Sequence, residues 1–566
     1  MKLVRIMVMV CGVLVMGMSA GWGLTKDGSY EVTTKNGPDA ETGGWFINLG
    51  ITGARGKMTQ DAPRVMEVAY VFKGTPADGV LQVGDRIVGV NGKRFREDHK
   101  FGYGMDKFGY EGPIMDIGHA LEESQGPELD GKLSFDLERD GVEMTVEIIL
   151  PTEYGQFSET YPFDCAKTDR MLAEMFEYLA DRQRDDGSWT GGRVYVDAFA
   201  ALALLASGDS KYKRNVEKAM RYFADRTNDE IDYGGYDCWK YGLWGVALAE
   251  YYLATEEKWV LDELDEINRW LVLSQFDKDY RNEKGAGGWG HRPKDKPGGN
   301  GYGPICMITA QAFAAWGLIG QCGLEVNRER YDLAQEFLEE GTNNIGYVWY
   351  ADGNAGDDKY ADMGRTGASA VAHAVSPFDE SKYRSFATKS AECIGENFNT
   401  FIDTHGSPLL GLGWTALGAA QDEDSFRSLM DEHVWHFNLS HCPDGTFYYQ
   451  PNRDNNPQDY TADARLSATA TTALVMAIKY GSLRVMGGEG RRNDEQGLMK
   501  EEGGNATEEM RTFYSADGDR SFEGILEGYD AATEEVTVRM SDGRVSRFPL
   551  SALSEEDRAF VLGEEE

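Results

Sequence analysis

Positive charge is scarce in this 566-residue chain. It holds 57 Lys and Arg against 95 Asp and Glu, which gives a formal net charge of −38 at pH 7. Most of such a surface repels the phosphate backbone of DNA and RNA. The composition therefore excludes a nucleic-acid-binding function, and we expect no nucleic-acid partner.

Long apolar runs are also rare. An uninterrupted run from Ile6 to Met16 follows Lys2 and Arg5 and is itself followed by small residues up to Gly21. The run is shorter than the about 20 apolar residues that span a bilayer, and its flanks are typical of a secretory signal peptide. We expect residues 1–20 to be a signal peptide, the protein to be secreted or periplasmic, and no membrane span to be retained.

Cysteine and histidine are few, with seven and eight residues respectively, and there is no CxxC pair. The cysteines after the signal peptide are expected to be buried, with the pairing of one or two bridges left open. His433, His436, His441 and Cys442 are the densest group of metal-binding residue types. Aromatic residues interleave with them, which favours packing histidines over a zinc site. We expect no metal and no cofactor.

Residues 44–152 alternate apolar and polar positions between Gly, Asn and Asp turns, which predicts a small β-rich domain. The segment from Gly74 to Gly92, with its Thr-Pro-Ala and Leu-Gln-Val-Gly-Asp-Arg-Ile stretches, resembles the signature of bacterial PDZ domains. In such domains a ligand strand adds to the sheet and backbone N–H groups bind its carboxylate. The resemblance implies a peptide groove formed by the loop residues Leu49, Gly50 and Ile51 and the helix residues Ile117 and Leu121. The alternative is that Leu49 and Ile51 pack against a neighbouring part of the chain.

From about residue 160 to 484 the apolar period changes to 3.6, which predicts about twelve helices. Six are charged on one face: Thr168–Arg184, Tyr212–Thr227, Lys258–Gln275, Asn327–Glu340, Lys382–Phe398 and Asp424–Phe437. Six others alternate with them and are rich in Ala, Gly, Leu and Thr: Val194–Ala206, Cys238–Ala254, Gly303–Gly320, Thr366–Val375, Leu410–Ala420 and Ala464–Ile478. Helices that are apolar nearly all round are buried, so this alternation predicts an α/α toroid of about six helical hairpins with an inner and an outer ring.

The loops that lead from outer to inner helices are long and rich in Gly and aromatic residues, and all fall on one rim of this toroid. Long loops in a compact domain usually carry function. The first contains Gln183-Arg184-Asp185-Asp186-Gly187-Ser188-Trp189. This stretch resembles the Gln-x-x-Asp-Gly-Ser-Trp repeat of the squalene cyclase and protein prenyltransferase superfamily, whose toroid holds its active site in a central cavity. The PDZ and toroid pair is similar to a family of secreted bacterial proteins of unassigned function.

The chemistry of the predicted mouth is open. The Asp-x-Asp-Asp acid of terpene cyclases is absent, and Asp237-Cys238 lacks the spacing of a prenyltransferase zinc site. Asp237, His291 and Asp444 are candidate catalytic residues, with Asp352 and Asp362 among further rim carboxylates. Carboxylates and aromatic rings in one mouth are typical of sugar-processing toroids. For each of these carboxylates, a structural role as a helix cap or a turn residue is favoured over catalysis.

Ligand-binding residues of the mouth are predicted from the same loops and the inner-helix starts: Trp189, Trp289, Tyr350, Arg365 and Tyr448. Arg365 and Arg465 are expected either to bind an anionic group or to pair with Asp362 and Asp463.

Residues 485–508 are rich in Gly and Glu and predict an acidic linker. Residues 509–562 follow, with alternating Val536-Thr537-Val538, a Phe548-Pro549-Leu550 stretch and Leu553-Ser554. They resemble the SLA1 homology domain 1, a small SH3-like β-barrel. The whole sequence thus predicts a multidomain protein: a toroid flanked by a PDZ domain and this barrel.

Because two of the three modules resemble peptide-binding domains, the leading hypothesis is an exported scaffold or adaptor that binds peptide or protein partners. Its toroid would serve as a ligand-binding cavity. The alternative hypothesis is a toroid enzyme, a hydrolase or lyase that acts on a glycan or lipid.

Overall fold

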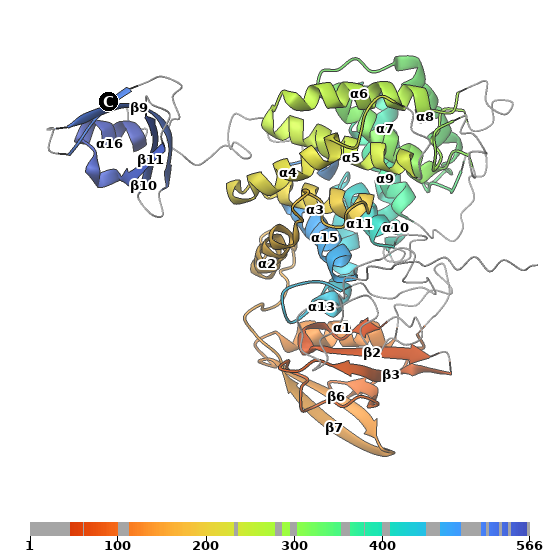
Figure 1. Ribbon diagram of the computed structural model, residues 1–566. Coiled ribbons are helices and arrows are strands. Elements are labelled where there is room, and N and C mark those ends of the chain that lie inside the picture. The colour runs from red at the N-terminus through yellow and green to blue at the C-terminus, as the bar shows by residue number, and fades with distance from the viewer. Residues whose placement is uncertain are drawn as a thin grey trace, which may run out of the picture.

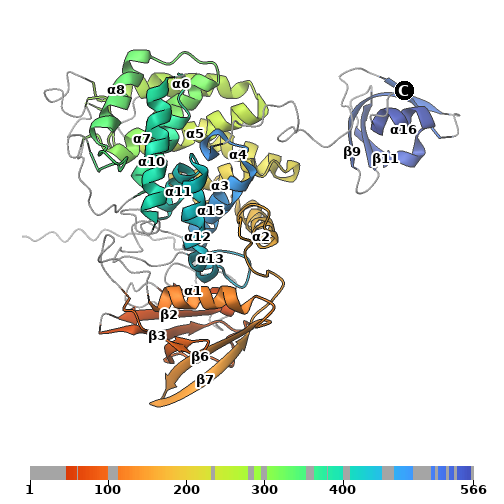
Figure 2. The same ribbon diagram turned by 180° about the vertical axis from the view of Figure 1, so that it is seen from behind.

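The computed structural model describes residues 46–59, 61–99, 112–230, 236–277, 286–294, 303–351, 363–378, 380–398, 408–448, 464–487, 511–516, 520–530, 535–540 and 545–562. Figures 1 and 2 show a β-rich domain at one end of a helical body. No helix among these residues has both the length and the apolar character needed to cross a membrane.

The N-terminal domain is an antiparallel sheet with one helix. Its strands are β1 (Ile47–Asn48), β2 (Ala54–Thr59), β3 (Ala62–Val71), β4 (Arg86–Val90), β5 (Lys93–Arg94), β6 (Lys132–Arg139) and β7 (Val142–Ile149). They are ordered β1-β2-β3-β4-β6-β7, with β5 on β4. The short η1 (Gly50–Thr52) precedes β2, and α1 (Pro113–Ser124) precedes β6. The assignment of this domain to the PDZ family stays a prediction.

The body is an α/α toroid, as the alternation of helix types predicts. Its inner helices are α3 (Val194–Ala206), α5 (Asp237–Thr255), α7 (Cys306–Gln321), α9 (Gly364–Ala374), α11 (Pro408–Ala419) and α15 (Ala464–Ala477). Its outer helices are α2 (Ala166–Arg182), α4 (Lys213–Ala224), α6 (Trp259–Ser274), α8 (Arg328–Glu340), α10 (Ser381–Glu396) and α12 (Glu423–Glu432). Each inner helix contacts the next, and α15 contacts α3, so the inner ring is closed.

Small residues let the inner helices approach closely. A Cβ atom on Gly367 of α9 would lie 2.1 Å from the carbonyl oxygen of Trp414 of α11. A Cβ atom on Gly364 would lie 2.5 Å from the Cα atom of Gly411. The Gly and Ala content of the inner helices is therefore a packing requirement of the ring.

One predicted helix is two helices in the structure. The sequence predicts a continuous helix from Asp424 to Phe437, but α12 ends at Glu432 and α13 (Val434–Ser440) follows. His433 separates them with φ −105° and ψ 15°, outside the helical range. The break turns α13 towards the N-terminal domain, where it lies on α1 in both views (Figures 1 and 2).

The C-terminal domain is a second, separately packed β unit. Its strands β8 (Arg511–Tyr514), β9 (Ser521–Asp530), β10 (Glu535–Met540) and β11 (Val545–Pro549) form one sheet in the order β11-β10-β9-β8. The short η8 (Leu550–Ala552) and α16 (Glu555–Leu562) complete it. Its buried side chains form an apolar cluster distinct from the cluster shared by the N-terminal domain and the toroid. Its assignment to the SLA1 homology domain 1 stays a prediction.

Candidate functional site

The rim loops are tied to the inner helices by a repeated hydrogen bond. In four loops the residue after a tight turn donates its backbone N–H, at 2.9–3.0 Å, to a side-chain oxygen in the first turns of the following inner helix. The donor and acceptor pairs are Trp189 with Asp197, Trp289 with Thr309, Val348 with Thr366, and Phe447 with Thr469. The repeated loop motif is therefore a structural device that fixes each loop on the rim.

Glutamine side chains extend this device to the outer ring. Gln183 Nε2 donates to the Gly187 carbonyl of its own loop at 2.9 Å and to the Asn215 carbonyl of α4 at 2.7 Å. Gln275 does the same with Gly287 and with Arg330 of α8, at 2.8 and 2.9 Å. The Gln of the repeat thus joins these two loops to the next outer helix.

The tryptophans of these loops are part of the same device. The Trp189 indole N–H donates to the Leu179 carbonyl at 2.7 Å, and that of Trp289 donates to Ser274 Oγ at 3.0 Å. Both side chains are buried. Tyr448, also predicted at the mouth, is buried against the N-terminal domain, with the Arg55 guanidinium 3.6 Å from its ring centroid. The structure therefore places these three residues in packing positions and not at the mouth.

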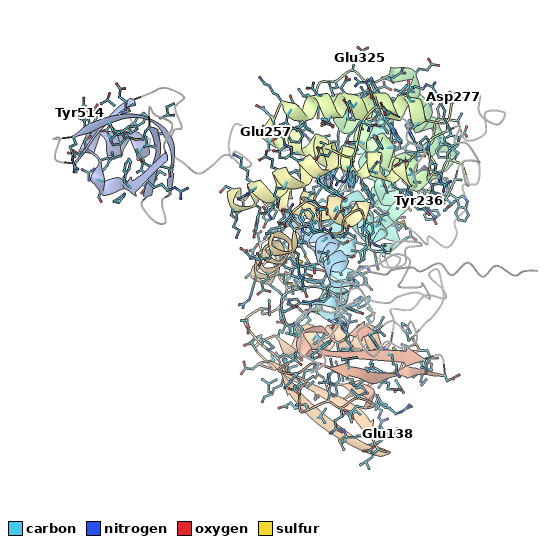
Figure 3. All side chains as sticks on the ribbon, in the orientation of Figure 1. Glu138, Tyr236, Glu257, Asp277, Glu325 and Tyr514 are labelled. Carbon is cyan, nitrogen blue, oxygen red and sulfur yellow. The ribbon has the colours of Figure 1, made fainter. Side chains whose placement is uncertain are left out.

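Partly exposed aromatic rings gather instead around the start of α5. The Trp239 indole N–H donates to His291 Nδ1 at 2.9 Å, and the Tyr236 ring meets the His291 ring edge-on at 5.4 Å. Tyr236, labelled in Figure 3, is 65% exposed. Tyr236 and Trp239 flank Asp237, the first residue of α5. We call Tyr236, Asp237, Trp239 and His291 the aromatic rim.

A second aromatic pair lies across the start of α7. The Cys306 N–H donates to the Tyr350 carbonyl at 2.9 Å, and the Ile305 N–H donates to the Trp289 carbonyl at 3.0 Å. The loops that carry His291 and Tyr350 therefore both adjoin the first turn of α7. Trp349 and Tyr350 are partly buried, and the Arg365 guanidinium lies 5.8 Å from the Trp349 ring centroid.

The charges of the aromatic rim are incompletely paired. Asp237 approaches Lys240 Nζ at 3.3 Å, but its Oδ2 atom is buried with no hydrogen-bond partner in the structure as described. Burial, with a contribution from Arg292, lowers the pKa of His291, so its ring is neutral at pH 7. Because the indole can only donate, Nδ1 is the acceptor and Nε2 carries the proton.

Asp444, the third catalytic candidate, belongs to a different part of the rim. Its carboxylate accepts hydrogen bonds from the Thr446 hydroxyl at 2.6 Å and the Thr446 N–H at 3.3 Å, and it forms an ion pair with buried Arg465. These contacts satisfy both oxygens. The structure thus brings His291 against Tyr236 and Trp239, which flank Asp237 in the sequence, while Asp237 itself pairs with Lys240. Asp444 has a turn and an ion pair instead.

Arg365 is buried and bonded. It donates to the Val348 carbonyl at 3.2 Å and to the Tyr347 hydroxyl at 2.8 Å. Arg465 forms an ion pair with Asp444. Asp352, Asp362 and Asp463 lie outside the described residues. The two arginines therefore brace the loops that precede α9 and α15.

The predicted peptide groove is filled by the toroid itself. Leu49, Gly50, Ile51, Ile117 and Leu121 are all buried, and α13 contacts both η1 and α1. The Asn48 side chain donates to the Leu439 and His441 carbonyls at 2.9 and 3.0 Å. A Cβ atom on Gly50 would lie 2.8 Å from the Asn438 carbonyl oxygen. A peptide cannot occupy the groove while α13 is there.

The histidines of α13 and its flanks are packing residues. His433, His436 and His441 are buried, and burial lowers their pKa values to about 4, about 3 and about 3. They are neutral at physiological pH. In the described part of the chain, no group of three or more His, Cys, Asp or Glu residues is arranged to hold a metal ion. The six cysteines in that part of the chain are buried, and none of them forms a disulfide.

Sequence reasoning missed Trp239, whose indole N–H bonds His291. The residue lies in a helix that reads as uniformly apolar, so its position near the exposed end of α5 is not evident from periodicity. Only one residue separates Trp239 from Asp237, and this proximity was the one indication in the sequence that Trp239 lies at the rim. His291 and Tyr236 fall in loops, where the sequence sets no mutual distance.

The closed ring of helix pairs, with loops fixed on one rim and a sheet domain packed on the body, defines an α/α toroid protein. The chain belongs to the family described as a domain of unknown function, DUF6288, which matches residues 168–487. The match covers the toroid and the segment that follows α15. No curated protein sequence matches the chain.

Several solved structures are similar to the toroid. The α-1,6-mannanase GH76A from Salegentibacter sp. HEL1_6 is 14% identical over 55% of this chain and 98% of its own, with a TM-score of 0.42. A type II terpene cyclase from Scytonema is 13% identical over 55% and 96%, with a TM-score of 0.36. A sugar epimerase from a ruminal bacterium is 13% identical over 55% and 97%, with a TM-score of 0.38. At these values the likeness concerns the fold alone.

The scaffold or adaptor hypothesis is wrong. The groove that was expected to bind peptide or protein partners is occupied by α13. The alternative hypothesis, a toroid enzyme that acts on a glycan or lipid, stays a prediction.

Proposed function

We propose that the toroid binds a neutral glycan at the aromatic rim and hydrolyses it. The observation that carries this proposal is the cluster of Tyr236, Trp239 and His291 at the start of α5, whose first residue, Asp237, has a buried Oδ2 atom without a hydrogen-bond partner. The flat apolar face of a sugar ring buries area against an aromatic side chain, while its hydroxyl groups need polar partners beside that ring. The rim supplies both.

The charge of the chain supports a neutral substrate. At a net charge of −38 an anionic polysaccharide is repelled at long range. The two arginines that were candidates for anion binding are bonded to loop atoms in the described structure. A neutral glycan avoids this repulsion and needs no cationic clamp.

Asp237 is our candidate for one of the two carboxyl groups that glycoside hydrolysis requires. Its Oδ2 atom makes no hydrogen bond and would accept one from a substrate hydroxyl that displaces the groups burying it. His291, which is bonded to Trp239 of the same helix, is neutral and keeps one ring nitrogen protonated. The second carboxyl group has to come from another rim loop. Asp352 and Asp362 are candidates from the sequence and lie outside the described residues.

The proposal is tested by titrating the full chain with neutral oligosaccharides of two to six hexose units and by assaying the release of new reducing ends. Trp239→Ala removes the stacking surface and is expected to weaken binding at least about tenfold. Asp237→Asn is expected to keep binding and to lower turnover at least about a hundredfold. Asp262→Asn is the matched control, because Asp262 lies in the first turn of outer helix α6.

Binding that Trp239→Ala leaves unchanged would place the glycan elsewhere and contradict the proposal. Turnover that Asp237→Asn leaves unchanged would remove Asp237 from the chemistry. The absence of any binding by the wild-type protein would overturn the glycan assignment itself.

We further propose that residues 44–152 are a PDZ-like module and residues 509–562 an SLA1-homology-like barrel, with the toroid before residue 488 and a linker at 488–508. Val485 and Met486, which the sequence assigns to the linker, are buried against the toroid. The sequence signature from Gly74 to Gly92 and the sheet with its single helix support the first. We also propose export through the signal peptide at residues 1–20. In this scheme the PDZ-like module supports the toroid structurally, because α13 fills its groove.

A further inference from the structure

The contacts that α7 makes with outer helices show which of its side chains face the axis of the inner ring. Thr309 bonds the Trp289 backbone, Phe313 packs on Tyr331 of α8 at 4.3 Å, and Trp316 donates to Asn268 of α6 at 2.7 Å. Each residue of an α-helix turns by about 100°, so these three share one side. Gln311 lies on the opposite side and faces the axis of the inner ring.

Gln311 has no hydrogen-bond partner in the described structure. Its side chain is fully buried, and neither Oε1 nor Nε2 is bonded. Buried amides are nearly always hydrogen-bonded, because an unpaired one loses its solvation without compensation. A water molecule or a ligand group that reaches this amide would therefore gain hydrogen bonds that the chain does not supply.

A second unpartnered polar group faces the same axis from α15. Thr469 bonds the Phe447 backbone and so marks the outer face of that helix. Thr471, two residues further, lies on the opposite side, and its buried hydroxyl has no partner among the described residues. Gln311 and Thr471 thus present an amide and a hydroxyl to the interior of the ring.

The surroundings of these groups are apolar. On α5, Tyr241 and Trp244 stack on outer-ring side chains, which places Trp239 and Val246 on the inner face. Phe199 of α3 reaches α11, where a Cβ atom on Gly413 would lie 2.5 Å from its ring. Trp239 is at the aromatic rim, so this inner face leads from the rim into the ring.

The opposite end of the ring is closed by the segment 482–487. Ser482 Oγ donates to the Ala206 carbonyl of α3, the Val485 N–H donates to Glu250 of α5, and Gln421 Nε2 donates to the Val485 carbonyl, at 2.8, 2.8 and 3.0 Å. The η7 turn (Arg484–Met486) also contacts α9 and α11. The segment therefore spans the C-terminal ends of four inner helices.

We propose that the axis of the toroid is a blind binding site for the terminal unit of a neutral saccharide chain, with Gln311 as the residue that hydrogen-bonds it. An amide offers an acceptor and two donors, which match a pair of sugar hydroxyls. Because the far end is closed, a chain can enter only by its end. This inference rests on the proposed glycan function and adds the direction of entry and the residue that selects the terminal unit.

The test uses the full chain and the oligosaccharides that the wild-type protein binds. Gln311→Met keeps the length of the side chain and removes its hydrogen bonds. We expect it to weaken binding at least about tenfold while the melting temperature stays equal or rises, since an unpaired buried amide is lost. Leu318→Met, on the same inner face of α7, is the control and is expected to bind like the wild type.

A second measurement tests entry by the chain end. Each oligosaccharide is labelled with a bulky fluorophore at either its reducing or its non-reducing end. One of the two labels is expected to abolish binding, because that end cannot enter the closed ring, while the other label has little effect.

Three results would each overturn this inference but leave the proposed function standing. The first is wild-type affinity in Gln311→Met, and the second is a fall in its melting temperature of the size expected for a lost structural contact. The third is equal binding of both labelled forms. If the wild-type chain binds no oligosaccharide, the proposed function and this inference fall together. If Trp239→Ala weakens binding but Gln311→Met does not, the proposed function stands without it.

Discussion

Gly187 occupies a turn of the rim that accepts no side chain. Its φ is +93°, and a Cβ atom would lie 2.2 Å from the Lys218 carbonyl oxygen of α4. Gly287, at the equivalent place before Trp289, has φ +90° and would bring a Cβ atom to 1.9 Å from the Leu333 carbonyl oxygen of α8. These turns let each loop contact the next outer helix at the glycine itself. A single glycine therefore fixes the position of each loop between the inner and outer helices.

We predict that Gly187→Ala lowers the free energy of unfolding by about 3 kcal/mol, because backbone strain and a clash with backbone act together. Gly84→Ala is the matched control, since Gly84 has φ +92° and nothing within 4 Å of a Cβ atom. Strain alone is expected to cost about 1 kcal/mol there. Urea unfolding measures both, and equal costs in the two variants would contradict the packing argument.

Glu250 makes stability depend on pH. Its buried carboxylate accepts the Val485 N–H, and burial raises its pKa from 4.5 to about 7. Arg484 acts in the opposite direction, and Cys322 faces the same carboxylate. A raised pKa means that the folded state holds its proton longer than the unfolded state. Stability is therefore lost as pH rises from about 4.5 to about 7.

We predict that Glu250→Gln, which retains an acceptor for Val485, becomes more stable than the wild type as pH rises through this window. The difference should grow by about 3 kcal/mol and level off above pH 7. Urea unfolding of both proteins from pH 4.5 to pH 8 measures it. Parallel stability curves would show that Glu250 does not titrate in the folded protein.

The sequence predicts which loops carry aromatic residues, but it does not predict which of those rings are exposed, because tertiary contacts determine that. The sequence identifies the Gly-Ser-Trp loop and its aromatic character, but Trp189 and Trp289 are buried because their indole N–H groups bond the ends of outer helices. Gln311 reads as one polar residue in an apolar helix. Only the contacts of Thr309 and Trp316 show that it faces the axis.

At the scale of elements, α13 determines the state of the N-terminal domain. A Cβ atom on Gly118 of α1 would lie 2.4 Å from the Trp435 carbonyl oxygen, so the two helices touch backbone to backbone. Buried Lys167 of α2 adds an ion pair with Glu122 of α1, with 2.6 Å between Nζ and Oε2. The interface is therefore close-packed and specific, as in a domain core.

We predict that Gly118→Leu separates the N-terminal domain from the toroid, because no leucine side chain fits against Trp435. His119→Leu, on the exposed side of the same helix, is the control and should leave the interface intact. Limited proteolysis between residues 150 and 165 reports the separation. Equal protection of both variants would argue that α13 and α1 are held by other contacts.

Helix positions were predicted closely, since α3 begins and ends at the predicted residues and most others differ by one to three residues. The alternation of apolar and amphipathic helices carries this information locally. The division at His433 was not predictable, because it serves a contact with α1, more than 300 positions earlier in the chain. For the same reason the PDZ-like signature gave no indication that its groove is filled.

At the scale of the molecule, the described chain has two main apolar cores. One runs through the N-terminal sheet and the toroid, and the other lies within residues 511–562. We predict two thermal transitions, and removal of residues 488–566 should delete one of them without shifting the other. Calorimetry of both chains measures this, and a single transition that moves on truncation would contradict two independent cores.

The central claim is that the aromatic rim leads a neutral glycan into the toroid. A crystal structure of the mature chain soaked with a neutral oligosaccharide tests it most directly. The account predicts a sugar ring stacked on Trp239, a hydroxyl within hydrogen-bond distance of Asp237, and the terminal unit against Gln311. An empty rim at saturating ligand, or a glycan bound on another surface, would contradict it.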